Sequence, residues 1–212
     1  MSKEWKSLME IAKIFQGKKG RLQYPGRFEA AVFIPLVETD EGLSILFEER
    51  SPELAWQPGE ISLPGGRIEK DDLSPADAAI RETCEELGLS PVDLEFYGEM
   101  DFFVSHMGLV IYPSVGRILT PEKMKPQPSE VARTFTVPLE WLLETEPRRG
   151  TVAVATKPQE GFPFDLLPEA YRRDWRSRTQ YEVLFYPYKE WVIWGLTGQV
   201  ISSFLKTLRE NE

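Results

Sequence analysis

Three glutamates, Glu82, Glu85 and Glu86, stand close together in a segment with helix signals at both ends. At about 100° per residue, a helix places their side chains within an arc of about 100°. Carboxylates one turn apart repel each other, which a solvated helix face tolerates and a bound cation relieves. Mg²⁺ takes oxygen ligands, often carboxylates together with water and phosphate. The cluster therefore indicates either a solvated face or a site for a divalent cation.

The helix that must position these glutamates is predicted over residues 74–87. Ser74 suits the N-cap, Pro75 the first helical position and Asp77 the acidic position of a capping box. Gly88 suits the stop after the last turn. The opposite side is predicted to face the core, and it carries Ala76, Ile80, Thr83, Cys84 and Leu87.

Arg81 and two glycines add to this pattern. Arg81 stands four residues from both Asp77 and Glu85, within reach of an ion pair. Gly65 and Gly66 follow an expected strand, where they let the backbone approach a ligand closely or form an ordinary turn.

These residues resemble the Nudix box, G-x5-E-x7-R-E-U-x-E-E-x-G-U, where U is apolar. Gly66, Asp72 and the run 81–89 carry the resemblance. Asp72 replaces a glutamate of the box, eight residues instead of seven separate it from Arg81, and Thr83 replaces an aliphatic residue. The one-residue insertion before Arg81 and the aspartate at position 72 resemble the pattern of the Nudix branch that includes coenzyme A diphosphatases.

Further segments resemble the same branch over about residues 28 to 208. They are Arg50-Ser51-x-x-Leu54, the run 59–66, Glu130-Val131, Val137-Pro138-Leu139 and 193–197. Gln57 stands where the upstream motif of the branch usually has histidine.

The resemblance implies an α/β fold, a Nudix-type α/β/α sandwich with a mixed sheet and the box as loop, helix and loop. It implies Mg²⁺ or Mn²⁺ ligated by Glu82, Glu85 and Glu86, with the Gly66 carbonyl as a weaker candidate. Arg81 would hold the acidic cluster in register, and the general base is left open between Glu82, Glu86 and Glu130. The substrate phosphates would be contacted by Arg50, Arg67, Gly65 and Gly66.

The implied reaction is hydrolysis of the pyrophosphate of a nucleoside-diphosphate derivative. Coenzyme A or acyl-coenzyme A, giving 3′,5′-ADP and phosphopantetheine or its acyl form, is the first expectation. ADP-ribose or a dinucleotide is the alternative that Gln57 keeps open. A non-catalytic nucleotide-binding regulator is a third, against which the intact glutamates of the box argue.

Composition restricts the partners and the location. The net charge is −9, from 34 acidic and 25 basic residues, which disfavours binding to nucleic acid or anionic lipid. Cys84 is the single cysteine, which excludes an intrachain disulfide, and we expect it to be buried and inert. No apolar run reaches the ~20 residues of a membrane span or forms a signal-peptide core. A cytoplasmic protein is expected, and a homodimer is left open.

The resemblance implies a single Nudix-type domain over 26–212, and a helical extension packed on it is expected over 1–25, with its helix at 2–16. Residues 146–180 are polar and are expected to form a surface excursion. Strands are expected at 30–37, 44–49, 93–101, 108–117, 134–138 and 181–186, and further helices at 139–144 and 191–208.

Overall fold

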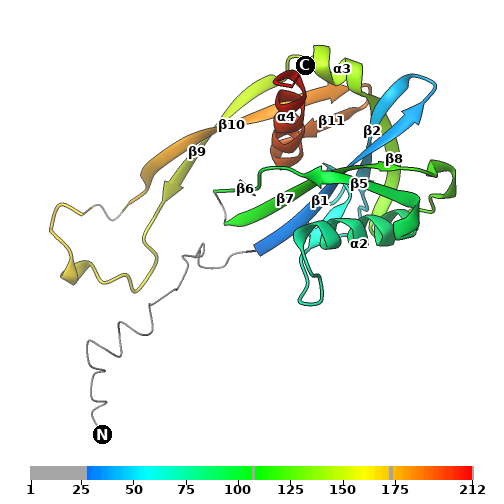
Figure 1. The fold of residues 1–212 in the computed structure, drawn as a ribbon. Helices are drawn as coiled ribbons and strands as arrows, with labels where there is room; N and C mark the ends of the chain where they lie inside the picture. Colours follow the sequence, from blue (N-terminus) through cyan, green and yellow to red (C-terminus); the bar gives the residue numbers. More distant parts are fainter. Residues whose placement is uncertain (1–27, 107, 172–173, 212) are drawn as a thin grey trace, which may run out of the picture.

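The computed structural model describes residues 28–106, 108–171 and 174–211 (Figure 1). The helix expected at 2–16 and the extension over 1–25 lie outside the described residues. Among the described helices, none has the length and apolar content needed to cross a membrane.

A mixed sheet forms the centre of the fold. β1 pairs in parallel with β7 and antiparallel with β2 and β4. β3 and β8 pair with β2, while β5 and β6 pair with β7. In the described part of the chain, the strands of this sheet are β1 (Phe28–Thr39), β2 (Gly42–Arg50), β3 (Ile61–Ser62), β4 (Gly65–Arg67), β5 (Leu94–Glu99), β6 (Phe103–Val104), β7 (Leu109–Ile118) and β8 (Val131–Pro138).

Alternating side chains of β1 supply two cores on opposite faces of this sheet. Ala31 and Phe33 pack with α2 (Pro75–Leu87) on one face. Ile34 packs on the other face, with α3 (Leu139–Glu144) and α4 (Gly195–Arg209). Figure 1 shows α2 below the sheet and α3 and α4 above it. The predicted α/β/α sandwich with a mixed sheet is confirmed.

The ends of α2 follow the local signals in the sequence. The Ser74 hydroxyl accepts from the Asp77 N–H at 3.1 Å and donates to the Asp77 carboxylate at 2.9 Å. Gly88 ends the helix in the left-handed region, at φ 64°, and its N–H donates to the Cys84 carbonyl. Because glycine adopts this conformation without steric cost, the helix stops where predicted.

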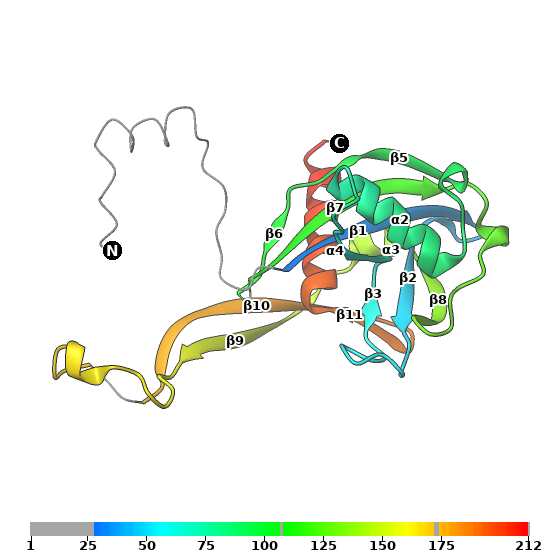
Figure 2. The same cartoon turned by 90° about the horizontal axis from the view of Figure 1, so that it is seen from below.

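A second sheet contains β9 (Arg148–Thr156), β10 (Arg176–Tyr188) and β11 (Trp191–Trp194). β9 and the first half of β10 form an arm that projects from the body of the protein (Figures 1 and 2). The excursion over 146–180 thus contains a long antiparallel ribbon that the sequence analysis missed. Its side chains are mostly exposed, so they lack the apolar alternation that marks a half-buried strand.

The helix predicted over 191–208 was wrong at its start. Trp191–Trp194 pair with β10 as β11, and α4 begins only at Gly195, where φ is 63°. An aromatic and β-branched run of four residues suits a strand as well as a helix. Trp191 stacks on Phe135 at 3.9 Å between ring centroids, whereas Trp194 is 40% exposed.

Short 3-10 turns complete the described elements. They lie at Pro91–Asp93, Pro121–Lys123 and Phe164–Leu166.

Candidate functional site

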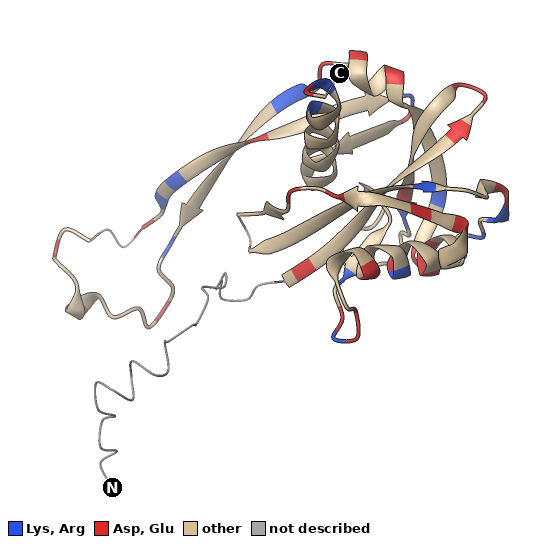
Figure 3. Ribbon diagram, in the orientation of Figure 1, with Lys and Arg blue, Asp and Glu red and all other residues tan. Residues whose placement is uncertain are grey.

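The three glutamates of α2 lie at very different depths. Glu86 is buried, at 4% exposure, while the side chain of Glu82 is 15% exposed and that of Glu85 is 60% exposed. Figure 3 shows acidic positions along this helix. The expectation of one face opposite the core was wrong for Glu86. α2 packs through Ala78 and Ala79, which turns Glu86 inward and leaves Cys84 only partly buried.

The two glycines of β4 lie directly against these carboxylates. The Gly65 N–H donates to Oε2 of Glu86 at 2.8 Å. Gly65 has φ 150°, and a Cβ there would overlap the Ala31 carbonyl oxygen. A Cβ on Gly66 would overlap the carboxylate of Glu82. The adjacent glycines therefore allow close approach of the strand to the acidic groups.

Arg81 joins the loop before α2 to the glutamates. Its Nε and Nη2 donate to the two oxygens of Asp72, each at 3.0 Å. Its Nη1 donates to Glu82 at 2.9 Å and to Glu85 at 3.3 Å, and Nη2 also donates to the Arg67 carbonyl at 3.1 Å. The bonds from Arg81 lower the pKa of Asp72. The aspartate that departs from the box pattern is thus the main anchor of Arg81.

A further carboxylate, Glu48, belongs to the same region and was missed by the sequence analysis. It lies on β2 and is 1% exposed. Its Oε1 accepts from the Ser62 hydroxyl at 3.2 Å, and burial raises the pKa of Glu48 to about 7. The run Glu48-Glu49-Arg50 suggests an exposed strand end, so only the fold places Glu48 inside.

The acidic side chains raise one another's pKa values. Burial and then the charge of Glu48 raise the pKa of Glu86 to about 9. Burial also raises the pKa of Glu82, and the nearby charge of Glu130 contributes to each of these shifts. Glu130, which precedes β8, therefore lies close enough to act on the cluster.

The donor set suits a hard cation. Burial of a carboxylate is costly unless a positive charge compensates it; Glu82 has Arg81 for this, whereas Glu86 has no ion pair among the described residues. Mg²⁺ or Mn²⁺ prefers oxygen ligands of this kind. Within the described residues, no group of three or more His, Cys, Asp or Glu side chains is already arranged to hold a metal ion. The fit therefore rests on the chemistry and burial of Glu82, Glu86 and Glu48.

A cavity of about 370 Å³ begins beside this cluster, with Gly65 and Arg50 in its lining. Arg50 Nε is buried and has no hydrogen-bond partner among the described residues, so it can still donate. Apolar side chains from β1, β7, β9, β10 and α4 form much of the wall, and they include Val32, Leu109, Ile111, Val152, Val183 and Leu196. Arg67 does not line this cavity, and its guanidinium lies 5.2 Å from the centroid of the Phe28 ring.

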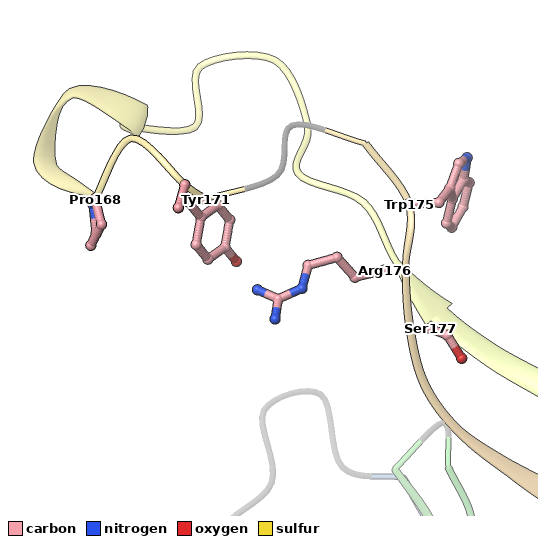
Figure 4. Close-up of a pocket in the computed structure, with 6 residues that line it drawn as sticks. Pro168, Tyr171, Trp175, Arg176 and Ser177 are labelled. Atoms are coloured by element: carbon pink, nitrogen blue, oxygen red, sulfur yellow. The ribbon is translucent and has the colours of Figure 1, made fainter.

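A larger hollow, of about 600 Å³, lies at the tip of the arm (Figure 4). Its lining residues are Pro168, Ala170, Tyr171, Trp175, Arg176 and Ser177. None of these carries a carboxylate or another metal ligand of the kind found at α2. The acidic cluster and the smaller cavity are therefore the candidate site.

Burial makes the single thiol a poor nucleophile. It raises the pKa of Cys84 to about 11, and Asp93 and Glu85 add to the shift. Because the thiolate is the reactive form, we expect iodoacetamide at pH 8 to alkylate the folded protein at least about tenfold more slowly than the urea-unfolded chain. Equal rates in the two states would contradict this expectation.

Comparison with known proteins identifies the family. A family model described as NUDIX domain matches residues 27–155. The chain is 33% identical over 187 residues to Nudix hydrolase 15, mitochondrial, and 35% identical over 188 residues to Nudix hydrolase 22, chloroplastic, both from Arabidopsis thaliana. Each alignment covers 84% of this chain, but only 58% and 55% of those relatives.

A third relative is the peroxisomal coenzyme A diphosphatase NUDT7 of Mus musculus. It is 31% identical over 116 residues, which are 55% of this chain and 49% of that protein. The family match spans the sheet, the glycine pair and the acidic helix that form the candidate site. The chain belongs to the Nudix family.

Proposed function

We propose that this protein is a metal-dependent hydrolase that cleaves the phosphoanhydride bond of a nucleoside-diphosphate derivative. The observation that carries the proposal is the buried Glu86, held by the Gly65 N–H and adjacent to further carboxylates. Family membership supports the same reaction class.

The side chains divide into a metal-holding set and a substrate-contacting set. Glu82, Glu85 and Glu86 would hold Mg²⁺ or Mn²⁺, which when bound neutralises pyrophosphate and lowers the pKa of water. Arg81 holds the loop before α2 in place through its two hydrogen bonds to Asp72, and it holds Glu82 through a third.

On the substrate side, Arg50 lines the cavity and would bind phosphate, since its Nε has no hydrogen-bond partner among the described residues. Gly65 and Gly66 give the phosphates access to the backbone. Arg67, at the surface over Phe28, would make an outer contact.

The general base is a carboxylate of this cluster. Glu82, Glu86 and Glu130 are the candidates, and Glu130 is the one outside the predicted metal set. Its charge contributes to the raised pKa values of both Glu82 and Glu86, which supports its nearness to the acidic cluster.

Coenzyme A or an acyl derivative is our first choice of substrate. Its pantetheine arm is linear and alternates methylene and methyl groups with amides, which suits a cavity of about 370 Å³ whose walls are largely apolar and include polar side chains such as Gln57 and Arg50. The partial similarity to a coenzyme A diphosphatase supports the same choice. Gln57, which lines the cavity, keeps ADP-ribose or a dinucleotide as the second candidate.

A substrate panel tests this choice. Purified protein with Mg²⁺ or Mn²⁺ would be given coenzyme A, acetyl-coenzyme A, ADP-ribose, NADH and nucleoside triphosphates, with products separated by chromatography. Selective formation of 3′,5′-ADP supports coenzyme A. Preferred cleavage of ADP-ribose or NADH would replace it by the second candidate, and binding without turnover of any compound would favour a regulator.

Gly66→Ala is expected to separate activity from stability. The added methyl meets the flexible end of Glu82, which can move aside, so the free energy of unfolding should change by less than about 1 kcal/mol. Turnover should fall at least about tenfold, because Glu82 leaves its position. Gly98→Ala, where a Cβ meets no atom within 4 Å, is the matched control and should keep wild-type turnover. Wild-type turnover in Gly66→Ala would contradict the role given to Glu82.

We also propose a cytoplasmic location, although the names of the Arabidopsis relatives place those proteins in organelles. Fractionation of the cells that produce the protein would decide between these locations.

A further inference from the structure

Glu48 points toward the acidic helix from a separate element of the fold. On β2, Leu46 belongs to the core under α2 and Phe47 belongs to the core on the opposite face. Because strand side chains alternate, Glu48 projects to the same face as Leu46, toward α2. It sits between Ser62 of β3 and Thr134 of β8 in the sheet register and is 1% exposed.

Within the described residues, only one oxygen of this carboxylate has a hydrogen-bond partner. Oε1 accepts from Ser62, whereas Oε2 is buried and has no hydrogen-bond partner among the described residues. Arg50 lies on the same face two residues later, but its Nε is also without a partner there. A buried carboxylate oxygen without a donor costs several kcal/mol unless another group satisfies it.

The group that satisfies Oε2 must also be compatible with Glu86. Glu86 is buried on α2, which packs on the face of the sheet that carries Leu46 and Glu48, and its own Oε2 takes the Gly65 N–H. Two groups could join the carboxylates, a shared proton or a divalent cation. A shared proton serves only these two side chains, whereas a cation also offsets the charge of Glu82 and Glu130.

We propose that Glu48 is a ligand of a divalent cation held between β2 and α2, together with Glu86 and Glu82. The inference rests on the proposed metal-dependent function and adds a ligand from outside the Nudix box. Mg²⁺ and Mn²⁺ accept six oxygen ligands, so a carboxylate from the sheet complements those from the helix. Ligands from two elements fix the ion relative to the glycine pair more firmly than one helix can.

Binding of Mn²⁺ to metal-free protein tests this ligand without a substrate. The free Mn²⁺ signal would be followed by electron paramagnetic resonance for wild type, Glu48→Gln and Glu48→Asp. Glu48→Gln removes the charge, while Glu48→Asp keeps the charge and withdraws it by one methylene. We expect both variants to weaken the tightest Mn²⁺ site at least about tenfold.

Glu49→Gln is the matched control. It removes a carboxylate from the same strand, but Glu49 points to the opposite face and binds Arg133 at 2.7 Å. Its Mn²⁺ affinity should stay within about twofold of wild type. Thermal unfolding of each metal-free variant checks that the variant is folded. If Glu48→Gln does not fold, the comparison of Glu48→Asp with wild type still tests the inference.

The outcomes separate this inference from the function on which it rests. Wild-type affinity in Glu48→Gln would show a shared proton and overturn the inference. Wild-type affinity in Glu48→Asp would show that only the negative charge of Glu48 matters and that its carboxylate does not bind the ion directly. This result would also overturn the inference. Absence of Mn²⁺ binding in the wild-type protein would instead remove the proposed metal-dependent function itself.

Discussion

Glu86→Gln is expected to lower metal-dependent turnover by at least about a thousandfold, equivalent to about 4 kcal/mol of transition-state stabilisation. Glutamine has nearly the shape of glutamate and can still accept from the Gly65 N–H, so the fold should persist. What it lacks is the negative charge that would help to hold Mg²⁺ or Mn²⁺ beside the substrate phosphates. The kcat with saturating Mg²⁺ measures the effect, and full activity would contradict the site assignment.

The same variant should change how stability depends on pH. The pKa of Glu86 is raised from 4.5 to about 9, so the folded protein holds this proton more tightly than the unfolded chain does. Its contribution to stability is therefore complete below pH 4.5 and is lost as the pH rises toward 9. Thermal unfolding of metal-free protein across this range should show a shallower decline for Glu86→Gln than for wild type. An unchanged slope would mean that Glu86 does not remain protonated in the folded state.

Arg81→Ala is expected to have the second largest effect, on both activity and stability. The arginine gives Asp72 two bonds, holds Glu82 and also donates to the Arg67 carbonyl. Its loss leaves Asp72, whose side chain is 6% exposed, without its guanidinium partner. We expect a loss of about 2 kcal/mol in the free energy of unfolding and a fall of about a hundredfold in turnover.

Arg81→Lys and Arg149→Ala are the comparison variants. Lysine keeps the charge but cannot form the two parallel bonds to Asp72, so Arg81→Lys should recover only part of the loss. Arg149 pairs with Glu182 on the exposed arm at 3.0 Å, and Arg149→Ala should cost less than about 1 kcal/mol. If Arg81→Ala lowers the free energy of unfolding no more than Arg149→Ala does, Arg81 does not stabilise the loop before α2 and Glu82.

The sequence predicts α2 well because the signals at its ends are local. Ser74 and Gly88 make their cap contacts with residues only three or four positions away. The depth of Glu86 is different, since it depends on how the helix packs against β1 and β4. Alanine, threonine and cysteine suit either side of a short helix, so their pattern does not identify the buried face.

Glu48 shows the limit of prediction more sharply. A carboxylate near the end of a strand, followed by Glu49 and Arg50, has the pattern of an exposed edge. Its burial follows from the pairing of β2 with both β3 and β8 and from the position of α2 over that face. The arm was missed for a similar reason, because its two strands stabilise each other through long-range backbone pairing rather than an apolar face.

Hydrolysis in ¹⁸O-labelled water, with and without EDTA, tests the central claim most directly. The substrate would be whichever nucleoside-diphosphate derivative of the panel is cleaved fastest, with Glu86→Gln in parallel. We predict that ¹⁸O enters one phosphate product only when Mg²⁺ or Mn²⁺ is present, and that Glu86→Gln abolishes this incorporation. Cleavage that continues in EDTA, or that persists in Glu86→Gln, would contradict a metal-dependent phosphoanhydride hydrolase built on the acidic helix.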